Sequence, residues 1–173
     1  MTQEELELLL ERLHHDCYGW ALACCRWNRE EALEVLQTAY VRVLEGRARL
    51  NGFPAPRAWL FGVIRRTALE QRRRWAVRAL GMLRWQRLEP VPPGPAGPAA
   101  QVEDDEARAR LRRLLDRLSS RQRDLLHLVF YQDMTIEEAA GVLSISLGTA
   151  RAHYERGKAR LRNLLAQEQV TRP

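Results

Sequence analysis

The sequence has three cysteines, a single lysine and no long hydrophobic run. Three cysteines, two of them adjacent at Cys24 and Cys25, cannot build a disulfide framework, and they fit a reducing compartment. The most hydrophobic stretches, residues 20–25 and 125–131, are much shorter than the roughly 20 residues that a membrane-spanning helix needs. The acidic start Met-Thr-Gln-Glu-Glu-Leu differs from the basic start of an export signal. We therefore expect a cytoplasmic protein without membrane insertion.

Catalytic and cofactor-binding motifs are missing as well. The chain has no Gly-rich phosphate loop, no His-Glu-x-x-His pair and no nucleophile elbow. Its 173 residues suffice for one ordinary domain or two small ones, which excludes a large multidomain enzyme. We predict a protein that is not an enzyme and has no catalytic residue, no metal ligand and no cofactor.

The charge that is present is unevenly distributed. The 28 Lys and Arg residues exceed the 22 Asp and Glu residues, which gives a formal net charge of +6. Six arginines and one acidic residue lie within residues 57–75, and five basic residues and one acidic residue lie within residues 147–165. Both stretches are predicted helices, so each is either a solvated surface or a site that holds a phosphate backbone and releases its counterions.

A segment rich in proline and glycine divides the chain. Residues 89–101 hold five of the eight prolines. Because proline removes a backbone donor and fixes φ, neither a helix nor a central strand can cross this segment. We predict an all-α fold of two small helical domains, the first in residues 1–88 and the second in residues 105–173, joined by a flexible linker in residues 89–104.

Helical periodicity organises the first domain. Apolar residues recur at steps of three and four over residues 6–27, which places them on one helix face. Asn28 can cap a second helix, and Gly46 can supply the left-handed residue that ends it. Glycine and prolines in residues 50–56 predict a loop, after which helical spacing resumes. The domain is therefore predicted to hold three or four helices.

The second domain carries the signals of a helix-turn-helix. Ser119 with Gln122 and Thr135 with Glu138 have the capping-box pattern that starts a helix, and Ser146 can cap a third helix. In such a unit the second helix enters the major groove of DNA. The residues of this helix predicted to reach base edges are Thr149, Arg151, Ala152, Glu155 and Arg156, and those better placed for phosphates are Ser146, His153 and Lys158.

Longer stretches resemble one protein family. Residues 118–162, which run from Leu-Ser-Ser-Arg-Gln-Arg through Thr-Ile-Glu-Glu-Ala-Ala to Ala-Arg-Leu-Arg, resemble region 4 of a bacterial extracytoplasmic-function (ECF) sigma factor of the sigma-70 family. Residues 31–44, Glu-Ala-Leu-Glu-Val-Leu-Gln-Thr-Ala-Tyr-Val-Arg-Val-Leu, resemble the polymerase-binding helix of region 2. Residues 56–74, which begin Pro-Arg-Ala-Trp-Leu-Phe, resemble the promoter-melting helix of region 2. The departures from the family pattern are Leu33 in place of an acidic residue, Thr67 in place of asparagine and Ser144 in place of glycine.

The resemblance implies a sigma factor that binds core RNA polymerase, at the β′ clamp helices and the β subunit, and directs promoter recognition and DNA melting. The residues implied to bind the clamp helices are Glu34, Gln37, Thr38, Val41 and Arg42. The residues implied to capture the opened minus-ten DNA are Asn51, Phe53, Arg57, Arg65 and Arg66. The helix-turn-helix is implied to read the minus-thirty-five duplex of promoter DNA, and an anti-sigma factor is implied as an inhibitory partner.

Two other hypotheses remain open. A stand-alone transcriptional regulator would bind an operator through the helix-turn-helix and use the first domain to dimerise or to sense a signal. A thiol or metal sensor would use Cys17, Cys24 and Cys25. Cysteines on an apolar helix face are usually small buried hydrophobes, which favours the binding functions over the sensor.

Overall fold

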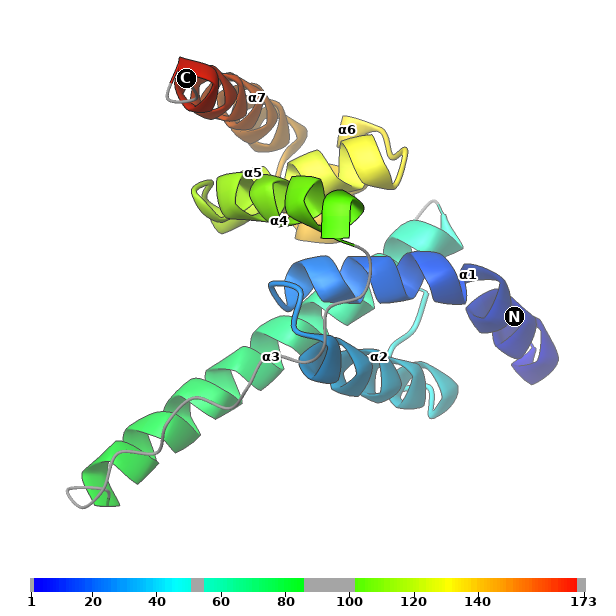
Figure 1. The fold of residues 1–173 in the computed structure, drawn as a ribbon. Helices are drawn as coiled ribbons and strands as arrows, with labels where there is room; N and C mark the ends of the chain where they lie inside the picture. The colour runs from blue at the N-terminus through cyan, green and yellow to red at the C-terminus, as the bar shows by residue number, and fades with distance from the viewer. Residues whose placement is uncertain (1, 51–54, 86–101, 171–173) are drawn as a thin grey trace.

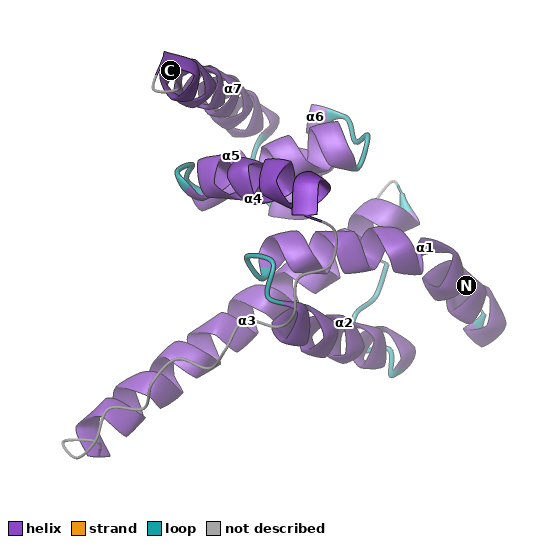
Figure 2. Ribbon diagram, viewed as in Figure 1, coloured by secondary structure: helices purple, strands orange, loops and turns teal. Residues whose placement is uncertain are grey.

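The computed structural model describes residues 2–50, 55–85 and 102–170. This part of the chain is helical and contains no strand, so the predicted all-α fold is confirmed (Figures 1 and 2). None of its helices has the length and hydropathy of a membrane span. The elements are α1 (Gln3–Cys24), α2 (Arg29–Leu44), α3 (Pro56–Trp85), α4 (Val102–Asp116), α5 (Ser120–Leu126), the π-helix η1 (His127–Tyr131), α6 (Ile136–Leu143) and α7 (Leu147–Val170).

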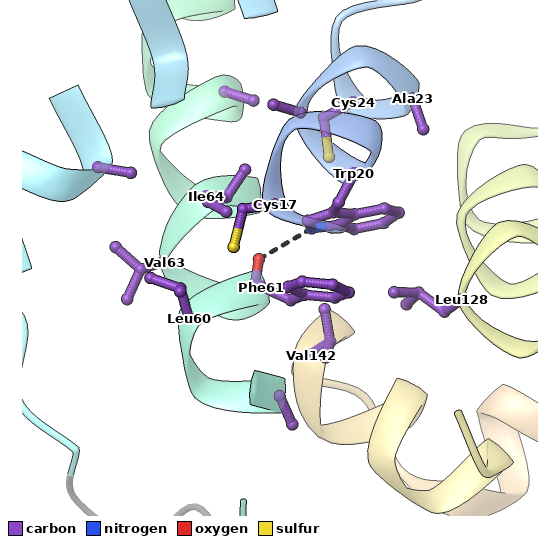
Figure 3. Packing of buried hydrophobic residues seen from close by; sticks show 14 of the residues in the cluster. Cys17, Trp20, Ala23, Cys24, Leu60, Phe61, Val63, Ile64, Leu128 and Val142 are labelled. Atoms are coloured by element: carbon purple, nitrogen blue, oxygen red, sulfur yellow. Dashed lines mark hydrogen bonds between the residues drawn. The ribbon is translucent and has the colours of Figure 1, made fainter. Parts of the chain in front are cut away.

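The first domain is built from α1, α2 and α3, which pack against one another. The predicted apolar face of α1 is its buried face, and Cys17 and Trp20 on it are fully buried. The Trp20 indole Nε1 donates a hydrogen bond to the backbone oxygen of Phe61 on α3, at 3.0 Å (Figure 3). This bond satisfies the polar atom of a large buried ring, so α1 and α3 are joined by both packing and a hydrogen bond.

Local signals place the ends of α2 as predicted. The Asn28 side chain accepts a hydrogen bond from the Glu31 backbone N at 3.2 Å, which caps the helix. Beyond the last turn, Gly46 has φ +69°, the left-handed conformation that glycine adopts without a steric penalty. α3 is one continuous helix of 30 residues, and its C-terminal part extends away from the rest of the domain (Figure 1).

The second domain consists of α4, α5, η1, α6 and α7. Both predicted capping boxes are present, at Ser119 before α5 and at Thr135 before α6. α6 ends at Leu143, the next residue Ser144 has φ 53° and ψ 49°, and α7 begins three residues after Ser144. This left-handed residue turns the chain between the two helices of the helix-turn-helix. Ser144 stands where the family pattern has glycine, and its backbone is in the left-handed conformation that glycine adopts most easily.

The predicted linker differs from the structure at its end. Most of residues 89–104 lie outside the described residues, but α4 already begins at Val102. Acidic residues favour the first turn of a helix because they complement its dipole, and an acidic run starts at Glu103. The helix therefore starts inside the span assigned to the linker.

The two domains share a hydrophobic core, which the prediction of flexibly joined domains did not include. Leu128 of η1 and Val142 of α6 belong to the same buried cluster as Trp20 and Phe61. Figure 3 shows the Phe61 ring directed toward Leu128 and Val142 of the second domain. α6 packs mainly on α3, and η1 contacts α1. The second domain therefore covers one side of the first.

Candidate polymerase and nucleic-acid interfaces

The outer face of α2 is partly apolar. The inner face of this helix is buried against α1 and α3. On the outer face, Leu33 and Val41 are each 47% exposed and Leu44 is 38% exposed. Glu34 and Gln37 lie on the same side and are exposed. Exposed apolar side chains next to polar ones are typical of a surface that receives another helix.

Thr38 and Arg42, which were also assigned to this face, are half-buried because they tie α2 to α3. Arg42 donates to the Thr67 hydroxyl at 3.2 Å through Nη1, and its Nη2 lies 2.7 Å from a carboxylate oxygen of Glu70. Gln71 Nε2 donates to the Thr38 hydroxyl at 3.3 Å. Thr67, which stands where the family usually has asparagine, is fully buried, and its hydroxyl accepts the hydrogen bond from Arg42.

The arginines of α3 fall into two groups. Arg66 is exposed. Arg65 is directed toward the second domain, where its Nε donates to Oδ2 of Asp124 at 3.2 Å. Arg57 donates to the backbone oxygen of Gln132 at 2.7 Å and to its side-chain Oε1 at 2.8 Å. Two of the residues assigned to minus-ten DNA are thus occupied by the second domain, and Asn51 and Phe53 lie outside the described residues.

Asp124 and Gln132 are interface residues that the sequence reasoning missed. Both are buried, with 8% and 4% of their surface exposed. Burial raises the pKa of the Asp124 carboxyl, and the nearby Arg65 guanidinium lowers it in part. The sequence signal for Asp124 was an acidic residue beside a short apolar segment, because a carboxylate that is buried there needs a partner. The sequence could not identify that partner, because it lies 59 positions away.

One side of α7 is buried in the helix-turn-helix, and the other side is exposed to solvent. Ala140, Leu143 and Ala150 are buried in α6 and α7, which pack against each other. At the start of α7, Ser146 Oγ accepts a hydrogen bond from the Thr149 backbone N at 3.2 Å and lies 2.8 Å from the Thr149 hydroxyl. These contacts fix the first turn of the helix. The predicted base-contacting residues that are exposed are Arg151, Ala152, Glu155 and Arg156.

Two predicted phosphate contacts have other surroundings. His153 is half-buried, and burial together with Arg156 and Arg121 lowers the pKa of its imidazole, so a neutral ring is favoured. Lys158 Nζ lies 2.9 Å from a carboxylate oxygen of Glu155 and 4.5 Å from the centroid of the Tyr154 ring. Both residues are therefore less available to DNA than Arg151 and Arg156.

The three thiols are buried and not activated. Burial raises the pKa of the Cys17 and Cys25 thiols to about 12, and it raises the pKa of Cys24 as well. A thiolate is the form that attacks oxidants and binds metals, so these side chains are poor candidates for such chemistry. No group of three or more His, Cys, Asp or Glu side chains that could hold a metal ion is found in residues 2–50, 55–85 and 102–170.

Comparison with known proteins decides the family. The family model described as "Sigma-70 region 2" matches residues 9–77, and the family model described as "Sigma-70, region 4" matches residues 114–163. An RNA polymerase sigma-E factor of Streptomyces avermitilis is 32% identical over 138 residues, which cover 78% of this chain and 71% of that protein. The chain belongs to the ECF group of the sigma-70 family. An ECF RNA polymerase sigma factor of Bacillus subtilis, SigX, is 24% identical over 92% of this sigma factor and 83% of its own length.

Two solved structures of protein complexes contain a chain with this fold. One is the sigma factor RpoE of Bartonella quintana in complex with the anti-sigma factor NepR, with a TM-score of 0.71 and 20% identity over 94% of this chain and 98% of that one. The other is CnrH in complex with the cytosolic domain of CnrY, with a TM-score of 0.65 and 21% identity over 96% of this chain and 90% of that one.

Membership of the family decides among the hypotheses drawn from the sequence. A sigma factor directs RNA polymerase to promoters and does not itself catalyse a reaction. The protein is therefore a transcription initiation factor. The stand-alone regulator and the thiol or metal sensor are not needed to explain its two domains.

Proposed function

We propose that the outer face of α2, formed by Leu33, Glu34, Gln37, Val41 and Leu44, binds the β′ clamp helices of core RNA polymerase. The exposure of three apolar side chains on one helix face carries this proposal. Burying these side chains against a partner helix would remove apolar surface from water, at about 25 cal/mol for each Å². Thr38 and Arg42 support the surface by fixing α2 on α3. Their role is to position the face.

The promoter-melting surface lies on α3 in this proposal. Arg66, Arg73 and Arg74 are exposed on this helix, where they can hold the phosphates of an opened strand. Arg57 and Arg65 lie on the same helix and would join them when the second domain moves away. Asn51 and Phe53 precede the helix and are proposed to receive an extruded base.

The exposed side of α7 is proposed to read the minus-thirty-five duplex. Arg151 and Arg156 can bond the guanine edge bidentately, and Ala152 can contact a thymine methyl group. The Ser146 cap holds the N-terminal turn that enters the groove. Because both DNA-binding surfaces are on one chain, their binding energies combine when the two promoter elements are correctly spaced.

Regulation by an anti-sigma factor is also proposed. RpoE and CnrH, whose folds resemble this one over nearly the whole chain, were solved in complexes with NepR and with CnrY. A protein that covered the outer face of α2 would block polymerase binding here. The apolar residues exposed on that face give such an inhibitor a surface to bind.

The polymerase-binding assignment is tested by a charged substitution on the outer face of α2. Val41→Asp should weaken binding to purified core polymerase by at least about tenfold, which corresponds to about 1.4 kcal/mol. The matched control is Leu8→Asp on α1, where Leu8 is 66% exposed and lies on another helix of the same domain. Equal binding by wild type and Val41→Asp, measured by fluorescence anisotropy and run-off transcription, would refute the assignment.

The DNA-binding assignments are tested separately for each domain. Arg66→Ala should reduce open-complex formation and leave polymerase binding unchanged.

Arg151→Ala or Arg156→Ala should weaken recognition of the upstream duplex by about 1 to 3 kcal/mol. Arg162→Ala, an exposed arginine near the other end of α7, is the control. A loss of the same size in the control would mean that Arg151 and Arg156 act only through general charge attraction.

A further inference from the structure

A small cavity between α3 and α5 is lined by charged side chains of both domains. Its volume is about 60 Å³. The lining includes three guanidinium groups, those of Arg65 and Arg72 on α3 and of Arg123 on α5, and a single carboxylate, that of Asp124. Positive charge therefore exceeds negative charge among the side chains that surround the cavity.

Arg123 is buried with its hydrogen-bonding capacity incompletely used. The residue is only 6% exposed. Its Nη1 donates to Oδ1 of Asp116 at 3.1 Å, but its buried Nε has no hydrogen-bond partner among the described residues. A buried N–H of a charged group that lacks an acceptor costs free energy, because it has lost its water. An acceptor inside the cavity would satisfy it.

The two carboxylates near the cavity do not balance its arginines. Asp124 is engaged by Arg65, whose Nε donates to Oδ2 at 3.2 Å. Asp116 pairs with Arg123, but its side chain is 53% exposed, so water screens its charge. Arg72 is half-buried and makes no hydrogen bond to another described residue. Two guanidinium groups, one from each domain, are thus left with donors to offer.

The size and chemistry of the cavity select a small anion. Its volume is that of about two water molecules, at about 30 Å³ each, so a single small ion fits and a sugar or a base does not. Guanidinium groups bind tetrahedral oxyanions through paired hydrogen bonds. The Ser120 hydroxyl and the Cys24 thiol also line the cavity and can donate. A cation would be repelled, and an apolar ligand would leave the Arg123 Nε without an acceptor.

We propose that this cavity binds a free tetrahedral oxyanion of the phosphate or sulfate class, held by Arg72 of the first domain and Arg123 of the second. Arg65 remains paired with Asp124 when the ion binds. The inference does not depend on the promoter assignments, because neither Arg72 nor Arg123 is among the proposed DNA contacts. A ligand that binds only the folded chain stabilises it, so the ion should make the protein more resistant to unfolding.

The binding test is calorimetric titration of the full chain with inorganic phosphate, and then with sulfate, in chloride buffer at constant ionic strength. Arg123→Gln and Arg72→Gln should each weaken binding at least about tenfold, as expected for the loss of a charged hydrogen bond. Arg121→Gln is the matched control, because Arg121 is an exposed arginine of α5 outside the cavity lining and its loss changes the charge equally. The Arg72 variant decides the question if Arg123→Gln fails to fold.

Thermal unfolding gives a second readout. Phosphate also stabilises proteins non-specifically, because it is excluded from their surfaces, so the rise in midpoint that it causes in the two cavity variants is the baseline. Wild type and Arg121→Gln should show a larger rise, and one that saturates.

The outcomes distinguish the occupants of the cavity. Saturable binding that both cavity variants lose and the control retains supports the site, and the tighter of the two ions identifies its preferred ligand. No saturable binding to wild type would mean that the cavity holds only water, and equal weakening in the control would mean general charge attraction. Displacement of phosphate by adenosine monophosphate would overturn the assignment to a free ion.

Discussion

His127 lies at the junction of the two domains, surrounded by aromatic rings. Its ring centroid is 5.4 Å from that of Trp20, 6.3 Å from that of Trp27 and 5.3 Å from that of Tyr131. Its Nε2 is buried without a hydrogen-bond partner. Burial lowers the pKa of this imidazole from 6.5 to about 4, because a charged ring would lose its hydration there.

This environment predicts acid sensitivity. Between pH 6.5 and about 4 the unfolded chain binds a proton at His127 that the folded chain does not, so stability is complete above this range and falls as the pH falls through it. The loss is at most about 3 kcal/mol, since each unit of pKa shift is worth about 1.4 kcal/mol. His127→Phe keeps the aromatic contacts and should be less acid-sensitive than wild type in urea unfolding at several pH values. Parallel pH profiles of the two proteins would contradict the prediction.

Ser144 is strained in the turn between α6 and α7, because a side chain is disfavoured at its φ of 53°. Ser144→Gly should stabilise the protein by up to about 1 kcal/mol, after the greater freedom of glycine in the unfolded chain is subtracted. Gly46→Ala is the opposing control, because Gly46 has φ +69° and no atom lies within 4 Å of an added Cβ, so only backbone strain would act. Chemical denaturation should show opposite signs for the two substitutions; the same sign for both would argue against strain at Ser144.

At the scale of single elements, α7 is positioned by a close approach to α5. A Cβ built on Gly157 would lie 3.3 Å from the Gln122 Cβ and 3.4 Å from Leu126 Cδ1, whereas one built on Gly148 of the same helix meets nothing within 4 Å. The absent side chain at Gly157 lets the two helices pack closely. Gly148 has no such role.

Substitution of these two glycines should separate packing from helix propensity. Gly157→Leu should destabilise the protein by about 1 to 3 kcal/mol, because α5 and α7 must move apart. Gly148→Leu should be neutral or stabilising, since leucine favours the helical state over glycine by roughly 0.5 to 1 kcal/mol. The measurement is the midpoint of thermal or urea unfolding. A similar loss at both positions would contradict the packing explanation.

The elements themselves were largely predictable from the sequence because their signals are local. The caps at Asn28, Ser119 and Thr135 act within three residues, and so does the turn at Gly46. The helical spacing of apolar residues likewise depends on near neighbours. The extent of α3 and the start of α4 were less well predicted, since helix ends respond to weaker signals.

The site was predicted only in part, for the opposite reason. Exposure of Arg151 and Arg156 follows from the period of α7 and agrees with the expectation. The engagement of Arg57 and Arg65 depends on partners 75 and 59 positions away. An arginine-rich helix face has the same sequence pattern whether it meets DNA, water or a protein carboxylate. Only the tertiary arrangement distinguishes these cases.

At the scale of the whole molecule, the shared core predicts that the domains stabilise each other. Phe61 is fully buried and contributes to the contact with α6. Phe61→Ala should cost about 3 to 5 kcal/mol, as expected for a large buried ring. Hydrogen exchange measured by mass spectrometry should then show lower protection in α6 as well as in α3. Unchanged protection in α6 would indicate that the second domain is stable independently of this contact.

The location of Phe61 and Trp20 has a final consequence for adaptation. If the second domain moves away from Arg57 and Arg65 during promoter melting, as proposed above, the surface that separates is also part of the buried hydrophobic core, and greater thermal stability would then slow initiation. Substitutions that strengthen this contact would raise the unfolding temperature and would also slow the separation of the domains. Selection for rapid initiation would favour a weaker contact between the two domains and a less stable protein.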